Sequence, residues 1–333
     1  MKWSRELRIA RRSMRTALKA ASAMGAAKVT GPFKPPQFSV PGSLAPALEV
    51  AEFGSNPGRL RMLVHVPPSP VRDAPLIVLL HGCGQNAASF AADAGWIRLA
   101  DRLAIPLVLP VQSEDNNQSR CFNWFRPAHA ARGGGEALSI RQMVSSAVQR
   151  FGSDSQRVFI AGLSAGGAMA AALLAAYPEV FAAGAVCAGL PVGAASSVSE
   201  ALRRMAEAGP PRSPDAWADQ ARRAAPHGYR GPWPRLSIWH GAADRVVDPE
   251  NARLLATQWA GLHGLDATAA ESRLLGGTRH EQWDVTQASG DSAFSHREIG
   301  KAAVELWTLD ALGHDWPPGA VEHIVRFWDI APG

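Results

Sequence analysis

Cysteine is scarce in this chain of 333 residues, which contains only Cys83, Cys121 and Cys187. Three cysteines are too few for a disulfide scaffold, and none lies in the close CxxC spacing of a zinc site. At most one disulfide bridge is possible. The sequence also lacks a run of about eighteen uninterrupted apolar residues, which a membrane-spanning helix would need. These absences exclude a disulfide-rich fold and a transmembrane helix, and nothing in the sequence calls for a metal.

Most of the chain carries no excess of either positive or negative charge. Residues 1–28 hold eight of the 34 Lys and Arg residues but only one of the 29 Asp and Glu residues. The remainder therefore carries 26 bases and 28 acids and is nearly neutral. A nucleic-acid-binding protein needs a basic face, which the body of this chain does not provide. We therefore expect no nucleic-acid partner.

The N-terminal segment, residues 1–47, is predicted to be a basic amphipathic leader followed by a proline-rich linker. Apolar residues in its first half recur at steps of three and four, which is a helical period. Two interpretations stay open. The Arg11-Arg12 pair before the weakly apolar residues 17–27 is compatible with an export signal, and a basic surface helix is the alternative.

The body of the chain, residues 48–333, alternates strand-like and helix-like segments. Continuous apolar runs that end in Gly or Pro are typical of strands buried on both faces of a parallel sheet, whereas residues 60–66 alternate like a half-exposed strand. This pattern predicts an α/β fold with a mostly parallel, doubly wound sheet and helices on both faces. Residues 191–230 lack a clean strand and are predicted to form a helical excursion. Buried strands are expected at 75–80, 105–109, 157–161, 181–186, 235–239 and 304–309, and helices at 86–103, 137–151, 165–176, 250–263 and 320–329.

The sharpest chemical signal is the sequence GLSAGG at residues 162–167, between an expected strand and an expected helix. It matches the G-x-S-x-G nucleophile elbow, in which a sharp turn lifts the serine hydroxyl above the sheet and glycines let strand and helix approach closely. The helix start also favours a developing oxyanion. A glycine turn that binds phosphate is the alternative, but the segment does not fit the G-x-G-x-x-G fingerprint. We predict that Ser164 is the nucleophile.

A serine nucleophile needs a base and an orienting acid, and in this type of site they follow the serine in the order acid, then histidine. Asp244 comes shortly after one expected strand and is the predicted acid. Asp248 is the alternative, although it is better placed to cap the helix that begins near Glu250. His314 follows the last expected strand, on the same sheet edge as Ser164 and Asp244, and is the predicted base.

The other histidines weighed against His314 fit other roles. His81 and His240 each precede a glycine at a strand end, where an imidazole holds a loop by hydrogen bonding. His280 and His296 lie in a polar, hairpin-like stretch and are expected at the surface. His323 lies in a helical run and is expected to face solvent.

A second glycine-rich turn, HGCGQ at residues 81–85, follows an expected strand and is of the H-G type that supplies an oxyanion-hole donor. We assign the two donors of the hole to the backbone N–H groups of Cys83 and of Ala165, the residue after the nucleophile. The side chain at position 83 matters less for this role than the geometry of its backbone.

In their chain order, these motifs resemble the polyhydroxybutyrate depolymerase family of esterases over about residues 60–320. The resemblance implies an α/β-hydrolase fold and an ester hydrolase, often secreted, that needs no metal or organic cofactor. It therefore favours an extracellular or periplasmic location, whereas the weak leader leaves a cytoplasmic one open. It also implies a disulfide between Cys83 and Cys121. The motifs that carry it are HGCGQ at 81–85, CFNWF at 121–125, RGGGE at 132–136, GLSAGG at 162–167, GPWPR at 231–235, HGAAD at 240–244 and GHDWP at 313–317.

The expected activity is hydrolysis, through an acyl-enzyme, of short-chain esters such as 3-hydroxybutyrate oligomers or polyhydroxyalkanoate. The expected partner is thus a small or oligomeric ester, and the oligomeric state stays open. Three alternatives remain: an acetyl or feruloyl esterase acting on polysaccharide, an amide hydrolase such as a poly(aspartic acid) hydrolase, and a hydrolase-like scaffold used only for binding. The complete set of Ser164, Asp244 and His314 counts against the last of these. For the polyanion, Arg120, Arg126 and Arg132 are the candidate cations of the cleft.

Aromatic residues in two loops near the reactive edge are candidate substrate contacts. Trp124, Phe125 and Trp316 are predicted to line an apolar pocket, with Asn123 and Glu136 as possible polar contacts. The alternative is that each ring anchors its loop to the core.

Overall fold

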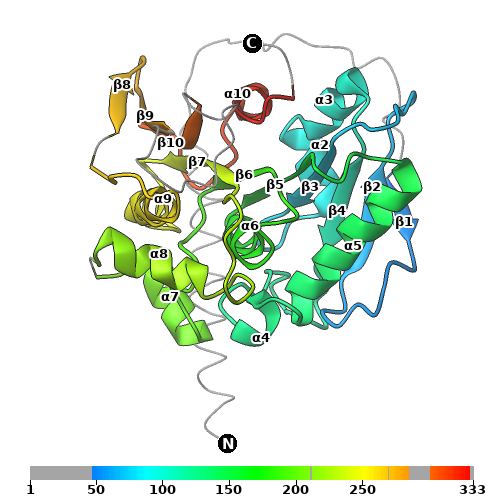
Figure 1. The fold of residues 1–333 in the computed structure, drawn as a ribbon, viewed down its shortest axis with the longest axis horizontal. Helices are drawn as coiled ribbons and strands as arrows, with labels where there is room; N and C mark the ends of the chain where they lie inside the picture. The colour runs from blue at the N-terminus through cyan, green and yellow to red at the C-terminus, as the bar shows by residue number, and fades with distance from the viewer. Residues whose placement is uncertain (1–46, 211, 269, 285–300, 331–333) are drawn as a thin grey trace, which may run out of the picture. The chain divides into compact units, whose positions relative to one another are not determined.

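The computed structural model describes residues 47–210, 212–268, 270–284 and 301–330, and its fold is shown in Figure 1. Residues 1–46, which hold nearly all of the predicted leader and linker, lie outside the described residues, and so does His296.

The described chain builds one sheet in the order β1-β2-β4-β3-β5-β6-β7-β10-β9-β8. The six central strands, from β4 to β10, pair in parallel, whereas the strands at both ends pair antiparallel. The predicted fold class, a mostly parallel sheet, is therefore confirmed. The strands are β1 Leu48–Val50, β2 Arg61–His65, β3 Leu76–Leu80, β4 Leu107–Val111, β5 Val158–Leu163, β6 Ala183–Cys187, β7 Arg235–Gly241, β8 Glu271–Leu274, β9 Thr278–Asp284 and β10 Ala302–Leu309.

Helices cover both faces of the sheet (Figure 1). Helices α2, α3 and α10 lie on one face, and α5, α6 and α9 lie on the other. This cover explains why every residue of β3, β5 and β6 is buried and why those strands read as unbroken apolar runs. The helices are α2 Ala87–Asp93, α3 Trp96–Leu103, α4 Pro127–Ala130, α5 Gly135–Phe151, α6 Ala165–Ala176, α7 Val198–Ala206, α8 Pro214–Arg222, α9 Glu250–Leu262 and α10 Ala320–Phe327.

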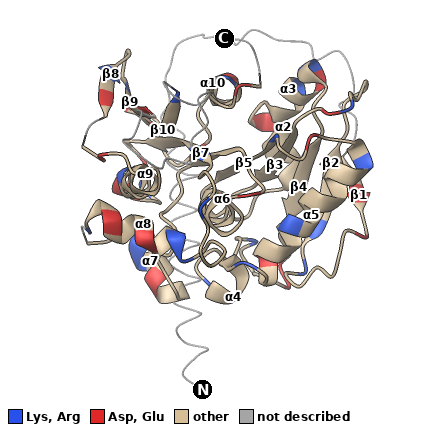
Figure 2. Cartoon of the chain, viewed as in Figure 1, with Lys and Arg blue, Asp and Glu red and all other residues tan. Residues whose placement is uncertain are grey.

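The charged residues lie mostly on the outer elements of the fold and are nearly absent from its centre. Figure 2 shows them on the outer helices and on the β8–β9 hairpin, whereas the central strands and α6 are drawn in tan. Helix α6 consists only of Ala, Gly, Leu and Met and is buried along its whole length. A helix that is apolar all round belongs in the interior, so α6 forms the middle of the core beneath the sheet.

Two local predictions from the sequence were wrong. The single helix expected at 86–103 is divided into α2 and α3, because Gly95 adopts a left-handed conformation with φ of 92°. Strand β1 was not predicted, and β8 and β9 fall where the sequence predicted at most a polar, hairpin-like stretch. In β8 all four residues are exposed, so its sequence carries no alternation of polar and apolar residues.

The predicted excursion at 191–230 contains helices α7 and α8. Ser197 and Ser213 cap the two helices, each accepting a hydrogen bond from a backbone N–H of the first turn. The buried amide of Gln258 in α9 then fixes the excursion, because it bonds both backbone groups of Val192 and the carbonyl of Trp217. Gln258 is one of several contacts that fasten the excursion to α9, since Asn251 also donates to Arg204 and Gly261 accepts from Arg222.

We expect His263, a buried histidine at the end of α9, to make folding sensitive to acid. Its Nε2 lies 3.3 Å from the carbonyl oxygen of Pro234. Burial lowers the pKa of His263 to about 4. The unfolded chain, with an ordinary histidine pKa of about 6.5, binds the proton more tightly, so stability rises with pH between these two values. Acidification from pH 7 to 4 should therefore cost about 3 kcal/mol at this residue.

Urea unfolding of the wild type and of His263→Gln over this pH range checks the expectation. The free energy of unfolding should fall less steeply for the variant, because glutamine keeps a donor for Pro234 and does not bind a proton. The exposed His227→Gln serves as the control and should follow the wild type. Parallel curves for His263→Gln and the wild type would show that His263 is not the acid-sensitive group.

Candidate active site

The G-x-S-x-G segment forms the turn between β5 and α6, as its sequence predicts. Ser164 holds a strained backbone conformation with φ of 58°, which lifts its side chain out of the strand. The two glycines that flank Ser164 are required because neighbouring backbone atoms leave no room for a Cβ atom. A Cβ on Gly162 would lie 2.3 Å from the carbonyl oxygen of Gly166, and one on Gly166 would lie 2.2 Å from that of Leu80. Strand, turn and helix are therefore packed too closely for any side chain at these two positions.

Ser164, His314 and Asp244 come together at the carboxyl ends of the parallel strands. The Nε2 atom of His314 lies 2.9 Å from Oγ of Ser164, and its Nδ1 lies 2.8 Å from Oδ2 of Asp244. A carboxylate only accepts hydrogen bonds, so Nδ1 carries the ring proton and Nε2 is left to accept the proton of the serine hydroxyl. This is the geometry of a nucleophile, a general base and an orienting acid.

Asp244 is held by donors on both of its oxygens. Its Oδ1 accepts the N–H groups of Val246 and Val247, at 2.8 and 3.0 Å, and Nε2 of His240 lies 3.1 Å from Oδ2. Burial raises the pKa of Asp244, but hydrogen bonds from His240, His314 and Val247 outweigh it and hold the pKa well below its usual range. The acid is therefore ionised throughout the neutral range.

The alternative acid, Asp248, has a different task. Its Oδ1 accepts the N–H of Glu250 at the start of α9, and its Oδ2 accepts the N–H of Ala208. Both oxygens are thus used to fix backbone, as expected of a residue that caps a helix.

The remaining histidines are placed mostly as the sequence indicates. Both ring nitrogens of His81 bond to backbone groups, and Nε2 of His240 also reaches the carbonyl of Val247 at 3.0 Å. His323 is exposed. The expectation that His280 is a surface residue was wrong, since its side chain is only 13% exposed, its ring stacks on Trp307 with centroids 3.9 Å apart, and its Nε2 lies 3.3 Å from Glu305.

Residues 81–85, called here the oxyanion turn, lie directly after β3. Among the described residues, neither the N–H of Cys83 nor that of Ala165 donates a hydrogen bond, so both are available to a ligand. A disulfide joins Cys83 to Cys121 in the loop between β4 and α4, residues 112–126, called here the β4–α4 loop. The turn that would supply one oxyanion donor is therefore covalently tied to the aromatic loop.

Two of the expected substrate contacts are interior residues instead. Trp316 is 9% exposed, and its ring packs edge-on against Phe90 and Trp96, with centroids 5.5 and 6.0 Å away. Asn123 is 2% exposed, donates to Glu136 and accepts from Asn117. The sequence places both next to reactive motifs, but ring packing commits Trp316, and hydrogen bonding commits Asn123, to holding their loops.

Trp124 and Phe125 pack edge-to-face, with centroids 5.6 Å apart, and each is 8% exposed. Most of each ring therefore anchors the β4–α4 loop, which leaves only a narrow edge to contact a substrate. Glu136 is fully buried and is likewise not a direct contact.

The three arginines proposed to bind a polyanion do not gather at the site. Nη2 of Arg120 donates to the carbonyl of Gly84 in the oxyanion turn, so this cation does lie beside the reactive edge. Arg132 donates to Ala176, at the end of α6 opposite Ser164, which is about 18 Å along a helix of this length. Arg126 lies over the ring of Phe125. Of the three candidate cations, Arg132 therefore lies away from the reactive edge.

No helix among the described residues is long and apolar enough to cross a membrane. No three histidine, cysteine or acidic side chains in this part of the chain are grouped so that they could hold a metal ion.

The mostly parallel sheet, with helices on both faces and the Ser164 turn at the carboxyl ends of its strands, is that of the α/β-hydrolase class. The acetyl xylan esterase from Aspergillus awamori has the same fold, with a TM-score of 0.75 and 24% sequence identity over 86% of this chain and all of that one. The chain belongs to the Esterase PHB depolymerase family, whose pattern it matches over residues 60–284.

Two proteins similar to this chain are named for different ester substrates. Poly(3-hydroxyalkanoate) depolymerase C from Paucimonas lemoignei is 40% identical over 269 residues, which is 81% of this chain and 61% of the relative. Feruloyl esterase B from Talaromyces stipitatus is 34% identical over 230 residues, 67% of this chain and 63% of the relative. The chain thus spans somewhat less than two thirds of the length of these relatives.

Proposed function

We propose that this chain is a serine ester hydrolase that works through a covalent acyl-enzyme. The observation that carries the proposal is the chain of two hydrogen bonds from Ser164 through His314 to Asp244. Membership of an esterase family supports the same activity.

In the first half of the reaction, Oγ of Ser164 attacks the ester carbonyl carbon while Nε2 of His314 takes its proton. The negative charge moves to the carbonyl oxygen, where the N–H groups of Cys83 and Ala165 stabilise it. Asp244 stabilises the positive imidazolium. His314 then gives the proton to the leaving oxygen, the C–O bond breaks, and an alcohol departs.

In the second half, water attacks the acyl-enzyme. His314 takes a proton from the water, the second tetrahedral species forms in the same oxyanion hole, and Ser164 leaves with the proton returned by His314. A carboxylic acid is released. No step uses a group from outside the chain other than ester and water.

For the substrate, we propose esters of short hydroxy acids, such as 3-hydroxybutyrate oligomers. The higher identity to the depolymerase from Paucimonas lemoignei supports this class. Acetyl or feruloyl esters of polysaccharides are the second candidate, supported by the feruloyl esterase and the solved acetyl xylan esterase.

Specificity constants on acetyl, feruloyl and 3-hydroxybutyrate esters with a common nitrophenol or methyl leaving group test the choice. We expect the highest kcat/KM on the 3-hydroxybutyrate dimer and trimer. A preference of tenfold or more for a feruloyl or acetyl ester, about 1.4 kcal/mol in transition-state binding, would replace the first candidate by the second.

A further inference from the structure

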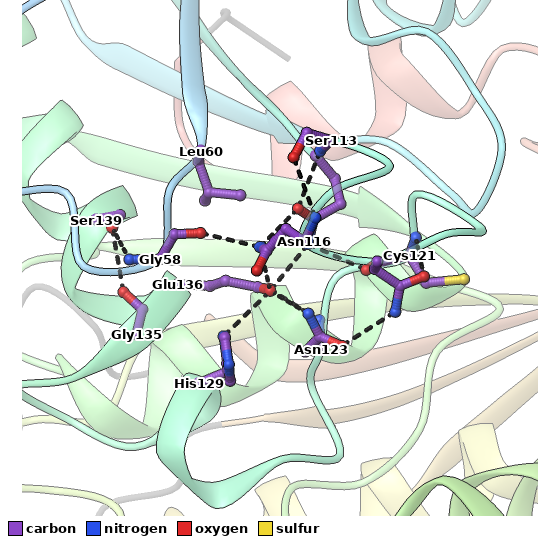
Figure 3. Close-up of polar contacts among 12 residues, drawn as sticks. Gly58, Leu60, Ser113, Asn116, Cys121, Asn123, His129, Gly135, Glu136 and Ser139 are labelled. Atoms are coloured by element: carbon purple, nitrogen blue, oxygen red, sulfur yellow. Dashed lines mark hydrogen bonds and ion pairs between the residues drawn. The ribbon is translucent and has the colours of Figure 1, made fainter. Parts of the chain in front are cut away.

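The β4–α4 loop is folded around one buried carboxylate that the mechanism does not use. Glu136 lies in the first turn of α5 and is fully buried. Its Oε1 accepts from the side chains of Asn123, Gln112 and Asn116, at 2.5, 2.9 and 3.2 Å, and Nδ1 of His129 lies 3.3 Å away. Its Oε2 accepts the backbone N–H of Asn123 at 2.8 Å. Figure 3 shows Asn116 and Asn123 of the loop, and His129 of α4, around the carboxylate.

The same loop holds the oxyanion turn at several points. The disulfide joins Cys83 to Cys121, whose carbonyl also accepts from Gln112. The N–H of Gly84 donates to Ser119, and the carbonyl of Gly84 accepts from Arg120. A shift of the loop is therefore passed on to the turn.

A further contact between the loop and the turn, through His81, sets the direction of the Cys83 N–H. The backbone N–H of Gln112 donates to Nε2 of His81 at 3.2 Å. Because Nε2 accepts, the ring proton lies on Nδ1, which donates to the carbonyl of Gly82 at 2.7 Å. That carbonyl and the N–H of Cys83 belong to one planar peptide group. Fixing the carbonyl therefore fixes the direction in which the Cys83 N–H points.

We propose that Glu136 is a positioning residue for the oxyanion hole, acting through the β4–α4 loop and His81; this inference rests on the catalytic site proposed above. The carboxylate suits the task because it only accepts hydrogen bonds, and the three side-chain amides and the backbone N–H that bond it are all donors. An amide of the same shape would turn an N–H donor toward other donors. The loop would have to move, and the Cys83 N–H would move with it.

The test is Glu136→Gln, compared with the wild type on nitrophenyl butyrate. We expect kcat to fall about 10- to 100-fold, because a misdirected donor weakens stabilisation of the oxyanion, while KM changes less than about threefold. Inhibition by butylboronic acid, which forms a tetrahedral adduct on the serine, should weaken together with kcat. A merely structural role would lower the amount of folded protein and leave the boronic acid affinity of the folded fraction unchanged.

Ser139→Ala is the matched control. Ser139 is buried on the same helix, one turn after Glu136, but its hydroxyl accepts from Gly58 and donates to Gly135, and neither of these lies in the β4–α4 loop (Figure 3). We expect it to lower the thermal midpoint and to leave kcat and boronic acid affinity near wild type.

A second variant, Gln112→Met, keeps the carboxylate and removes the amide that joins it to Cys121. If Glu136→Gln does not fold, Gln112→Met must show the selective loss of kcat and boronic acid affinity for the proposal to stand. Unchanged kcat in folded Glu136→Gln, or an equal loss in Ser139→Ala, would overturn it. If Ser164→Ala retains activity, the proposed mechanism fails as well; if Ser164 is essential and Glu136→Gln is fully active, the positioning role alone fails.

Discussion

Ser164→Ala should lower kcat on nitrophenyl butyrate by about 10⁶-fold, to the rate left by binding and the oxyanion hole alone. Without Oγ no acyl-enzyme forms, and His314 has no serine proton to accept. Alanine fits the turn, since the two glycines that require close backbone contact are at positions 162 and 166. The variant should therefore fold as the wild type does.

A fluorophosphonate probe provides the second readout. It should label the wild type at Ser164 and leave Ser164→Ala unlabelled, with near-equal thermal midpoints for the two proteins. A variant that keeps more than about one hundredth of wild-type kcat would point to another nucleophile.

Asp244→Asn should lower kcat by about 10⁴-fold through the tautomer of His314. The N–H groups of Val246 and Val247 require an acceptor at Oδ1, so an asparagine must place its NH₂ group where Oδ2 faces His314. His314 would then accept through Nδ1 and carry its proton on Nε2. In that form it cannot take the proton of Ser164.

Asp248→Asn is the matched control, because Asp248 bonds backbone N–H groups near α9 and not the imidazole. It should change kcat by less than about threefold while lowering the thermal midpoint slightly. If Asp244→Asn lowered kcat no more than Asp248→Asn does, Asp244 would have no role in the mechanism. Thermal midpoints of both variants separate this result from unfolding.

The central sheet and the Ser164, His314 and Asp244 cluster were predictable because each depends on a local pattern joined to one topological rule. Buried parallel strands are unbroken apolar runs, and their carboxyl ends share one edge of the sheet. Residues separated by 150 positions, such as Ser164 and His314, could therefore be assigned to one site. Their catalytic roles await the variants above.

Other features left no pattern in the sequence. The surroundings of Glu136 depend on amide donors from a loop that precedes it by 13 to 24 residues, and no fixed spacing encodes such a loop. Trp316 adjoins a reactive motif, and only packing against Phe90 and Trp96 distinguishes an anchor from a pocket wall. The edge strand β8 is exposed at every residue and so lacks the periodicity that marks a strand.

The anchoring of Trp316 affects how the protein responds to heat. The indole lies only two residues beyond His314 and is embedded among core aromatic rings, so the segment that carries the imidazole cannot detach while those rings stay packed. We therefore expect inactivation on warming to accompany melting of the interior, without an earlier loss of turnover from fraying of the loop that carries His314.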